Sequence, residues 1–179
     1  MRKSALLIID VQKALCTGRW AAFDIDRVIQ RINAVAAKAR AAGAPVVLIQ
    51  HEDAEALRFG SEGWQLDERL AARPQDIRLR KTATDSFHRT ELQALLQSRG
   101  VGQLVVCGLQ SEFCVDSTVR AALALGYPVV LVADAHATMD NGVLSAAQIS
   151  AHHNATLANI DSFGPRVTTT AAAELRIEA

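Results

Sequence analysis

The sequence carries no excess of charge and no long hydrophobic run. Its 19 basic and 19 acidic residues leave a formal net charge of zero, which argues against nucleic acid as a partner. No apolar stretch is long enough to span a bilayer, so no membrane partner is expected. The apolar run at residues 5–9 stops at Asp10, and no small-residue cleavage site of a signal peptide follows it. We therefore expect a cytoplasmic protein.

Cysteine is scarce as well. The three cysteines, Cys16, Cys107 and Cys114, are an odd number and have neither a CxxC pair nor a metal-type spacing. A disulfide framework and a zinc site are therefore not indicated, and each cysteine must be judged by its own surroundings. Cys107 lies in an apolar run and is expected to be structural. Cys16 falls in a loop, where it could lie near a site or simply be exposed.

Several common motifs are missing. Residues 100–108, GVGQLVVCG, lack a third glycine in place and precede a strand, so they are not a dinucleotide-binding loop, and no GxSxG or Walker sequence occurs. The adjacent His152 and His153 would lie roughly a quarter-turn apart on a helix, which is poor geometry for one metal ion. We expect this histidine pair at the surface or at an interface.

The sequence does contain an alternation of short apolar runs and longer helical segments. Strands that are separated by helices build β-α units with a mostly parallel sheet. With 179 residues, enough for one core but short for two, the chain is predicted to be a single α/β domain over residues 1–179. Four runs are apolar throughout, as in strands buried on both faces: 5–9, 45–49, 103–107 and 128–132.

Helical periodicity fills most of the remaining chain. Asp24 is predicted to be the N-cap of the first helix, and Thr90 and Gln93 have the spacing of a capping box at the start of the second. Residues 52–80 have no clean period and are predicted to form a long excursion over the surface, of the kind that builds sites. The predicted helical segments are 24–43, 90–100, 115–126 and about 144–159.

Three side chains are candidates for chemistry, which in a parallel sheet gathers at the carboxyl ends of the strands. Asp10 follows the first strand, where desolvation would make it a better proton acceptor; a loop cap is the alternative. Cys114 begins a helix after a five-residue turn, an order like the nucleophile elbow of α/β hydrolases, and a buried core cysteine is the alternative. Lys81 could stabilise a thiolate by its positive charge if it lies beside a cysteine, and a solvated surface lysine is the alternative.

Two blocks of sequence carry a family resemblance. Residues 5–12 read ALLIIDVQ, and residues 81–135 run from KTATDSFHRTELQ through GLQSEFCVDST to PVVLVADA. Over residues 4–160 the chain thereby resembles the isochorismatase-like cysteine hydrolase superfamily, which includes nicotinamidases, N-carbamoylsarcosine amidase and ureidoacrylate-type amidases. The resemblance implies a three-layer α/β/α fold with a six-stranded, mostly parallel sheet, and a homodimer or homotetramer.

The resemblance also implies the parts of an active site. Asp10, Lys81 and Cys114 match the catalytic triad of the superfamily. A non-proline cis peptide is expected between Leu109 and Gln110. The backbone N–H groups of Gln110 and Cys114 would then form an oxyanion hole.

Metal binding is where the chain departs from one branch of the superfamily. Nicotinamidases carry an Asp-x-His pair after the second strand and a further histidine before a glycine-rich turn, and all three bind a metal. Here the first place reads His51-Glu52-Asp53 and the second holds Phe59. The ligand set is incomplete, so we predict no catalytic metal and no cofactor, and nicotinamide is less favoured as substrate. A weak metal site beside His51 and Asp53 is left open.

The cysteine bears on the type of bond that is cleaved. Isochorismatases proper tend to lack it, because vinyl-ether hydrolysis needs no thiol nucleophile. Cys114 therefore favours cleavage of a C–N bond in a small amide or ureide through a thioester intermediate. Leu15, Trp64, Gln110 and Glu112 are expected around the substrate, from their neighbourhood to the triad. Ser111 and Phe113 are expected to serve the turn and the packing instead.

Two other functions stay open on the same scaffold. One is a redox-sensing or binding protein that uses the thiol without turnover, although such a protein does not need Asp10, Lys81 and Cys114 together. The other is vinyl-ether hydrolysis of a chorismate-derived acid, which requires an anion-binding residue in the pocket. By neighbourhood alone, the candidates for that residue are Arg19, Arg58 and Arg80.

Overall fold

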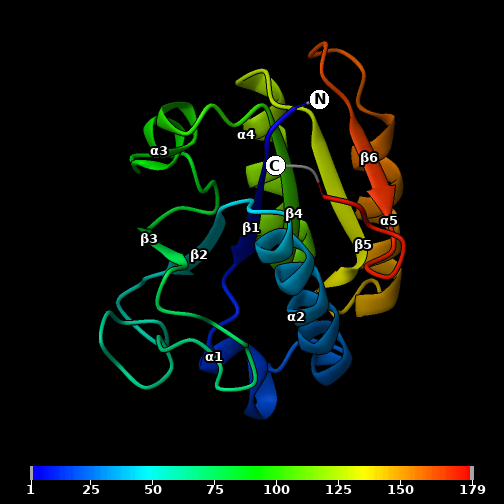
Figure 1. The fold of residues 1–179 in the computed structure, drawn as a ribbon. Coiled ribbons are helices and arrows are strands. Elements are labelled where there is room, and N and C mark those ends of the chain that lie inside the picture. Colours follow the sequence, from blue (N-terminus) through cyan, green and yellow to red (C-terminus); the bar gives the residue numbers. More distant parts are fainter. Residues whose placement is uncertain (1, 178–179) are drawn as a thin grey trace.

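The sheet at the centre of the protein has six strands, all parallel (Figure 1). The computed structural model describes residues 2–177, so the predicted domain of 1–179 extends slightly beyond the described residues. The strand order is β3-β2-β1-β4-β5-β6, and the predicted α/β fold with a six-stranded sheet is confirmed. The strands are β1 (Ser4–Ile9), β2 (Val46–His51), β3 (Ile77–Lys81), β4 (Gln103–Leu109), β5 (Val129–Ala137) and β6 (Val167–Thr170).

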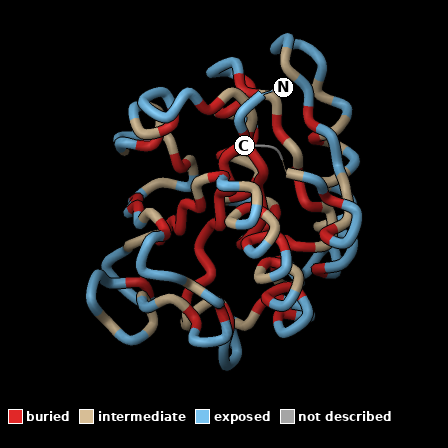
Figure 2. Tube along the Cα trace, viewed as in Figure 1, coloured by how far each residue is buried: buried red, intermediate tan, exposed pale blue. Residues whose placement is uncertain are grey.

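Helices cover both faces of this sheet. The helix α2 packs on one face, while α3, α4 and α5 pack on the other (Figure 1). Each face has its own cluster of buried apolar side chains, and Figure 2 colours the backbone by burial, with the central strands largely buried. Within residues 2–177, no helix combines the length and the apolar character that a membrane crossing requires. The α-helices are α1 (Lys13–Cys16), α2 (Ile25–Ala41), α3 (Leu92–Ser98), α4 (Asp116–Ala124) and α5 (Ala146–Asn159).

The strands form where the sequence is apolar throughout, because both faces are covered. All six residues of β1 are buried, and its register pairs Ile8 with Leu48 of β2 and with Cys107 of β4. Alternate side chains of each central strand therefore enter opposite cores. The structure thus explains why four runs could be identified without any alternation of polar and apolar residues.

Two strands escaped the sequence prediction. The strand β3 lies inside the segment that was expected to be excursion, and its residues alternate in burial because it is an edge strand. The other edge strand, β6, has only four residues, two of them exposed. Edge strands lack the continuous apolar run that the prediction relied on. The strand β5 also extends past the predicted run of 128–132, to Ala137.

The predicted helix caps were partly wrong. Asp24 does precede α2, but it has a left-handed backbone and its side chain makes no cap hydrogen bond. Thr90 does not form a capping box with Gln93, because α3 begins only at Leu92; its hydroxyl donates to the carbonyl oxygen of Ser86 at 2.6 Å and accepts from the N–H of Leu92 at 3.3 Å. The capping box lies instead at α5, between Ser145 and Gln148. Caps depend on where the preceding loop goes, which spacing alone does not determine.

Two core cysteines predict how stability responds to alkaline pH. Burial raises the pKa of the Cys16 thiol from its ordinary value of 9.0 to about 12 and also raises the pKa of the Cys107 thiol. Above pH 9 the unfolded chain loses protons that the folded chain keeps, so the free energy of unfolding falls by about 1.4 kcal/mol per pH unit for each such thiol. Urea denaturation between pH 7 and pH 11 measures this slope.

In Cys16→Ala the free energy of unfolding should fall less steeply with pH, by about 1.4 kcal/mol per pH unit, which is the contribution of one thiol. The loss of packing caused by the substitution is read at pH 7, where no thiol titrates, and is subtracted. An unchanged slope in Cys16→Ala would contradict the assignment of this alkaline instability to the buried thiol.

Candidate active site

The carboxyl edge of the sheet brings together three side chains from distant parts of the chain. Asp10 directly follows β1, Lys81 is the last residue of β3, and Cys114 lies in the helical turn after β4. The Nζ atom of Lys81 is 2.7 Å from Asp10 Oδ2 and 3.2 Å from Cys114 Sγ. The three residues that the sequence singled out for chemistry therefore form one cluster.

Lys81 is the centre of this cluster. Its side chain is fully buried, which is rare for lysine and requires the charge to be paired. Besides Asp10 and Cys114, its ammonium contacts His51 Nδ1 at 3.1 Å and donates to the carbonyl oxygen of Ala83 at 3.1 Å. The alternative of a solvated surface lysine is wrong.

The carboxylate of Asp10 is buried, and its oxygens have lone pairs that are still able to accept a hydrogen bond or a proton. Asp10 is 1% exposed, and within the described part of the chain neither of its oxygens makes a hydrogen bond of good geometry, so its contact with Lys81 is an ion pair. The alternative, a carboxylate that caps the loop by accepting from nearby backbone N–H groups, is therefore wrong for Asp10. A buried carboxylate with open lone pairs beside a thiol can accept the proton of that thiol.

The thiol of Cys114 is protonated at neutral pH. Its pKa is raised to about 12: burial is the largest cause, the nearby Asp10 carboxylate adds to it, and the ammonium of Lys81 works in the opposite direction. The cluster therefore does not store a thiolate. Any nucleophilic reaction of Cys114 needs a base that takes the proton as the sulfur attacks.

The short segment that begins with Asp10 is anchored by backbone bonds and by the side chain of Gln12. The backbone of Asp10 is left-handed, with a φ of 51°, and its N–H donates to the carbonyl oxygen of Ile49. The fully buried amide of Gln12 accepts from the N–H of His51 and donates to the carbonyl oxygens of His51 and Trp64. These bonds tie the segment after β1 to the end of β2 and to the loop that follows.

His51 also belongs to the cluster. The sequence suggested it only as a metal ligand and did not predict its contact with Lys81. It is the last residue of β2, and the register of the parallel pair sets it directly beside Lys81. Burial and the ammonium of Lys81 lower the pKa of its imidazole, so the ring is neutral and its Nδ1 accepts from Lys81. Only the position of β3, which was not predicted, could have revealed this pairing.

As a metal site the cluster does not fit. Asp10, His51 and Cys114 do offer ligand atoms within 4.8 Å of one another, but the ammonium of Lys81 contacts all three residues and supplies the positive charge there. Asp53 does not join His51, because its Oδ1 accepts from the backbone N–H groups of Glu55 and Leu57.

The turn that carries Cys114 is shorter than predicted. The strand β4 continues to Leu109, and a π-helical turn (Ser111–Val115) leads into α4, so Gln110 alone separates strand from helix. The peptide bond between Leu109 and Gln110 is cis. The carbonyl oxygen of Gln110 accepts from the N–H groups of Phe113 and Val115, and Cys114, also among the described residues, does not donate to it.

A buried polar network supports this turn from behind. The hydroxyl of Ser111 is 2.8 Å from Nδ1 of His136 and 2.9 Å from the hydroxyl of Ser150. Nε2 of His136 is 3.0 Å from Oδ1 of Asn154, whose amide nitrogen donates to the carbonyl oxygen of Ala133. Nε2 therefore carries the proton and Nδ1 accepts from Ser111, in keeping with a pKa that burial lowers. The network anchors the turn to β5 and α5.

A cavity of about 550 Å³ adjoins this turn. Leu15, Gln110 and Glu112 line it, as does Arg19, whereas Trp64 is not among the lining residues. The ring of Trp64 packs edge-on against Phe59 instead, with centroids 4.8 Å apart.

The two remaining arginine candidates lie away from this cavity. Arg58 lines a smaller neighbouring hollow, of about 460 Å³, together with His51 and Asp53. Arg80 is paired with Glu52 and lies over the ring of Phe59. Of the three arginines proposed as anion-binding residues, only Arg19 borders the 550 Å³ cavity.

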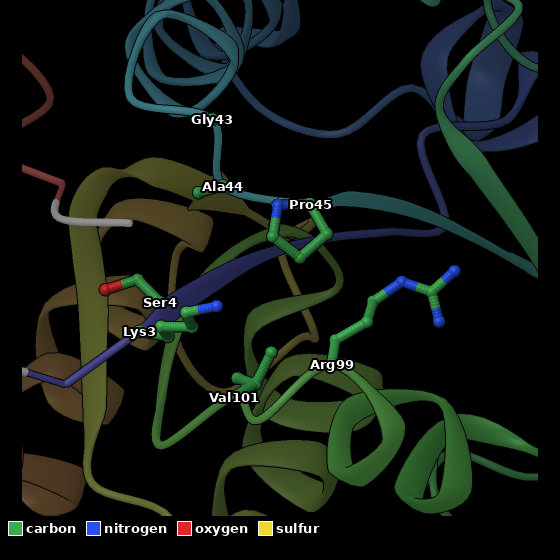
Figure 3. A pocket seen from close by; sticks show the side chains of 7 residues that line it. All are labelled: Lys3, Ser4, Gly43, Ala44, Pro45, Arg99 and Val101. Carbon is green, nitrogen blue, oxygen red and sulfur yellow. The ribbon is translucent and has the colours of Figure 1, made fainter.

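Another hollow, of about 300 Å³, lies at the opposite end of the strands (Figure 3). Its lining residues come from the amino ends of β1, β2 and β4, so it is remote from the cluster around Lys81. Figure 3 labels them: Lys3, Ser4, Gly43, Ala44, Pro45, Arg99 and Val101. This hollow has no part in the chemistry of the cluster.

The fold and the cluster define an α/β protein with a cysteine, a lysine and a carboxylate at the carboxyl edge of its sheet. The chain matches the family model of the isochorismatase domain over residues 4–172. It therefore belongs to the isochorismatase family. A solved structure described as an isochorismatase family protein has a TM-score of 0.86 and 39% identity, covering 94% of this chain and 98% of that one.

Two curated relatives are similar in sequence. A streptothricin hydrolase of Streptomyces noursei is 44% identical over 138 residues, covering 76% of this chain and 50% of the relative. A ureidoacrylate amidohydrolase of Caulobacter segnis is 30% identical over 209 residues, covering 95% of this chain and 84% of the relative. The chain spans about half the length of the streptothricin hydrolases that it matches.

Proposed function

We propose that this protein is a cysteine-dependent hydrolase that cleaves a C–N bond of a small amide or ureide. One observation carries the proposal: a buried ammonium, that of Lys81, contacts both the carboxylate of Asp10 and the sulfur of Cys114. Such an arrangement has the parts of nucleophilic catalysis, namely a nucleophile, a base and a group that orients both. Two relatives whose names denote a hydrolase and an amidohydrolase support it.

The first half-reaction forms a thioester. The sulfur of Cys114 attacks the carbonyl carbon of the substrate while its proton moves to Asp10, which the high pKa of the thiol requires. Lys81 keeps the carboxylate oriented and offsets the charge that grows on sulfur. The C–N bond then breaks, and the leaving amine takes the proton from Asp10.

The second half-reaction restores the enzyme. Asp10 accepts a proton from water as that water attacks the thioester carbon. The C–S bond breaks, and the sulfur of Cys114 regains the proton. The same carboxylate therefore serves as base in both attacks and as acid in both departures.

The oxyanion of each tetrahedral intermediate is held by the backbone N–H groups of Gln110 and Cys114. This role is supported by the position of Cys114 in the turn: among the described residues, the carbonyl oxygen of Gln110 takes its hydrogen bonds from Phe113 and Val115 and none from the N–H of Cys114. Preorganised donors of this kind contribute most where water is excluded.

A redox-sensing role is less well supported. Sensor cysteines are accessible and have a low pKa, whereas burial raises the pKa of Cys114 to about 12. The thiol of Cys114 therefore needs a base to take its proton before it reacts, and it does not present the thiolate that a redox sensor uses.

The proposal is tested by trapping the acyl-enzyme. The protein is incubated with a panel of small amides and ureides, quenched in acid, and mapped by peptide mass spectrometry while the released amine is measured. We expect an acyl adduct on the Cys114 peptide, together with amine release. Cys16→Ala, which removes another buried thiol, should retain both. Amine release without any adduct on Cys114, or reversible oxidation of Cys114 with no turnover of the panel, would overturn the proposal.

A further inference from the structure

The cavity beside the turn of Cys114 is strongly acidic. Among its lining residues are four carboxylates and a single guanidinium, that of Arg19. One of the carboxylates, Glu112, lies in the same π-helical turn as Cys114 and two residues before it. A substrate that places its carbonyl group at Cys114 therefore extends into surroundings of negative charge.

Of the two carboxylate oxygens of Glu112, one accepts a hydrogen bond and the other does not. Its Oε1 accepts from the hydroxyl of Thr138 at 2.8 Å, and Thr138 is 1% exposed, so this side of the carboxylate is fixed. Its Oε2 is buried and has no hydrogen-bond donor among residues 2–177. A buried oxygen without a donor is costly, and the cost is greatest for a charged group. A ligand that brings a donor to Oε2 removes this cost on binding.

The other charged groups of the cavity do not supply that donor. Arg19 lies over the ring of Trp20, with its guanidinium carbon 4.8 Å from the ring centroid. Asp140 accepts from the backbone N–H of Ala146, and Asp53 accepts from its own loop. These two acids keep their negative charge near the cavity while their Oδ1 atoms serve the backbone.

Exposed aromatic rings complete the surroundings. Phe113 lines the cavity and is 52% exposed; Trp20 also lines it and is 53% exposed, with the guanidinium of Arg19 over one of its two faces. Aromatic faces next to carboxylates are the surroundings in which proteins recognise alkylammonium groups, because the ring quadrupole attracts a cation. An anionic substrate would meet four carboxylates there, which weighs against a chorismate-derived acid.

From these observations we infer that the substrate is a small amide with an aliphatic ammonium group, which binds in this cavity with its N–H donors directed to Glu112. The inference rests on the proposed hydrolase function and names its substrate class. Glu112 is then a specificity-determining residue: its carboxylate recognises the positive charge of the substrate, two residues before the nucleophile Cys114 in the same turn.

The test compares three series of linear amides of matched chain length, which end in an ammonium, a methyl or a carboxylate group. Turnover is measured as kcat/KM with the wild-type protein, and binding is measured by calorimetry with Cys114→Ala. We expect the best ammonium amide to be preferred over its methyl counterpart by about 10- to 100-fold, as for a charge-assisted hydrogen bond. The carboxylate series should be the poorest.

Glu112→Gln is the decisive variant, because glutamine keeps an oxygen for Thr138 and replaces the charged Oε2 by a neutral donor. It should remove the preference for ammonium, in turnover and in binding alike. Glu91→Gln is the matched control: it makes the same charge change on an exposed residue at the start of α3, far along the chain from the cavity, and should keep the preference.

The outcomes separate this inference from the hydrolase proposal. Binding of ammonium amides that depends on Glu112, without amine release or an adduct on Cys114, supports the inference and defeats the hydrolase. Hydrolysis with no preference for ammonium, a preference that survives in Glu112→Gln, or no detectable binding of any ammonium amide overturns the inference.

Discussion

Asp10→Asn and Cys114→Ala are each expected to lower kcat by about 10⁴-fold, and the double variant to lose little more than either one. The reason is that the two groups act in one step. The thiol of Cys114 is protonated in the resting protein, so without the base the nucleophile is not formed, and without the nucleophile the base has no function. Asparagine keeps the shape of aspartate but cannot accept the proton.

Steady-state kinetics of the three variants on one amide measures this coupling. Circular dichroism and urea denaturation must accompany the kinetics, because Asp10→Asn also leaves the buried ammonium of Lys81 without its partner. Cys16→Ala is the control for loss of a buried thiol and should keep kcat within a few-fold. Losses that multiply in the double variant would contradict the joint action of Asp10 and Cys114.

The central part of the fold was accessible from sequence because it obeys a local rule. Strands β1, β2, β4 and β5 are covered on both faces, so each contains an unbroken run of at least four apolar residues, and this pattern can be read in a single chain. The edge strands β3 and β6 obey no such rule. Their partners on one side are water or loops, and only the resemblance to a family led to the expectation of six strands.

The candidate site divides in the same way. Asp10 and Cys114 follow predicted strands, so the general placement of sites at the carboxyl edge was enough to select them. Lys81 lies at the end of a strand that the pattern did not reveal, and local reasoning alone favoured solvent exposure for it. Its complete burial is made possible by three non-local partners, Asp10, His51 and Cys114, which no window of sequence contains.

The supporting residues were the hardest to anticipate. His51 contacts Lys81 through the register of two parallel strands, and His136 reaches Ser111 across 25 positions of sequence. Each of these histidines has its pKa lowered by burial and serves as a neutral hydrogen-bonding group. A lone histidine in sequence has no local signal that distinguishes such a role from a surface position.

Gly108→Ala is expected to destabilise the fold severely, by at least about 4 kcal/mol or to the point where no soluble protein is obtained. Gly108 pairs with Ile9 in the register between β4 and β1 and has a φ of 119°. A Cβ atom built there would lie 2.1 Å from the carbonyl oxygen of Ile9, a backbone atom that cannot move aside alone. The close approach of these two strands sets the distance between the loops that carry Asp10 and Cys114.

Gly102→Ala is the matched control for this substitution. Gly102 lies directly before β4, its N–H donates to the carbonyl oxygen of Lys3, and a Cβ atom there would meet the side chain of Arg2 at an ordinary 3.6 Å. Its free energy of unfolding in urea should stay within about 0.5 kcal/mol of the wild type. If Gly108→Ala were as stable as Gly102→Ala, β4 and β1 would be free to separate at this point. The geometry that brings the carboxylate to the thiol would then depend on the loops alone, because the sheet would no longer fix their separation.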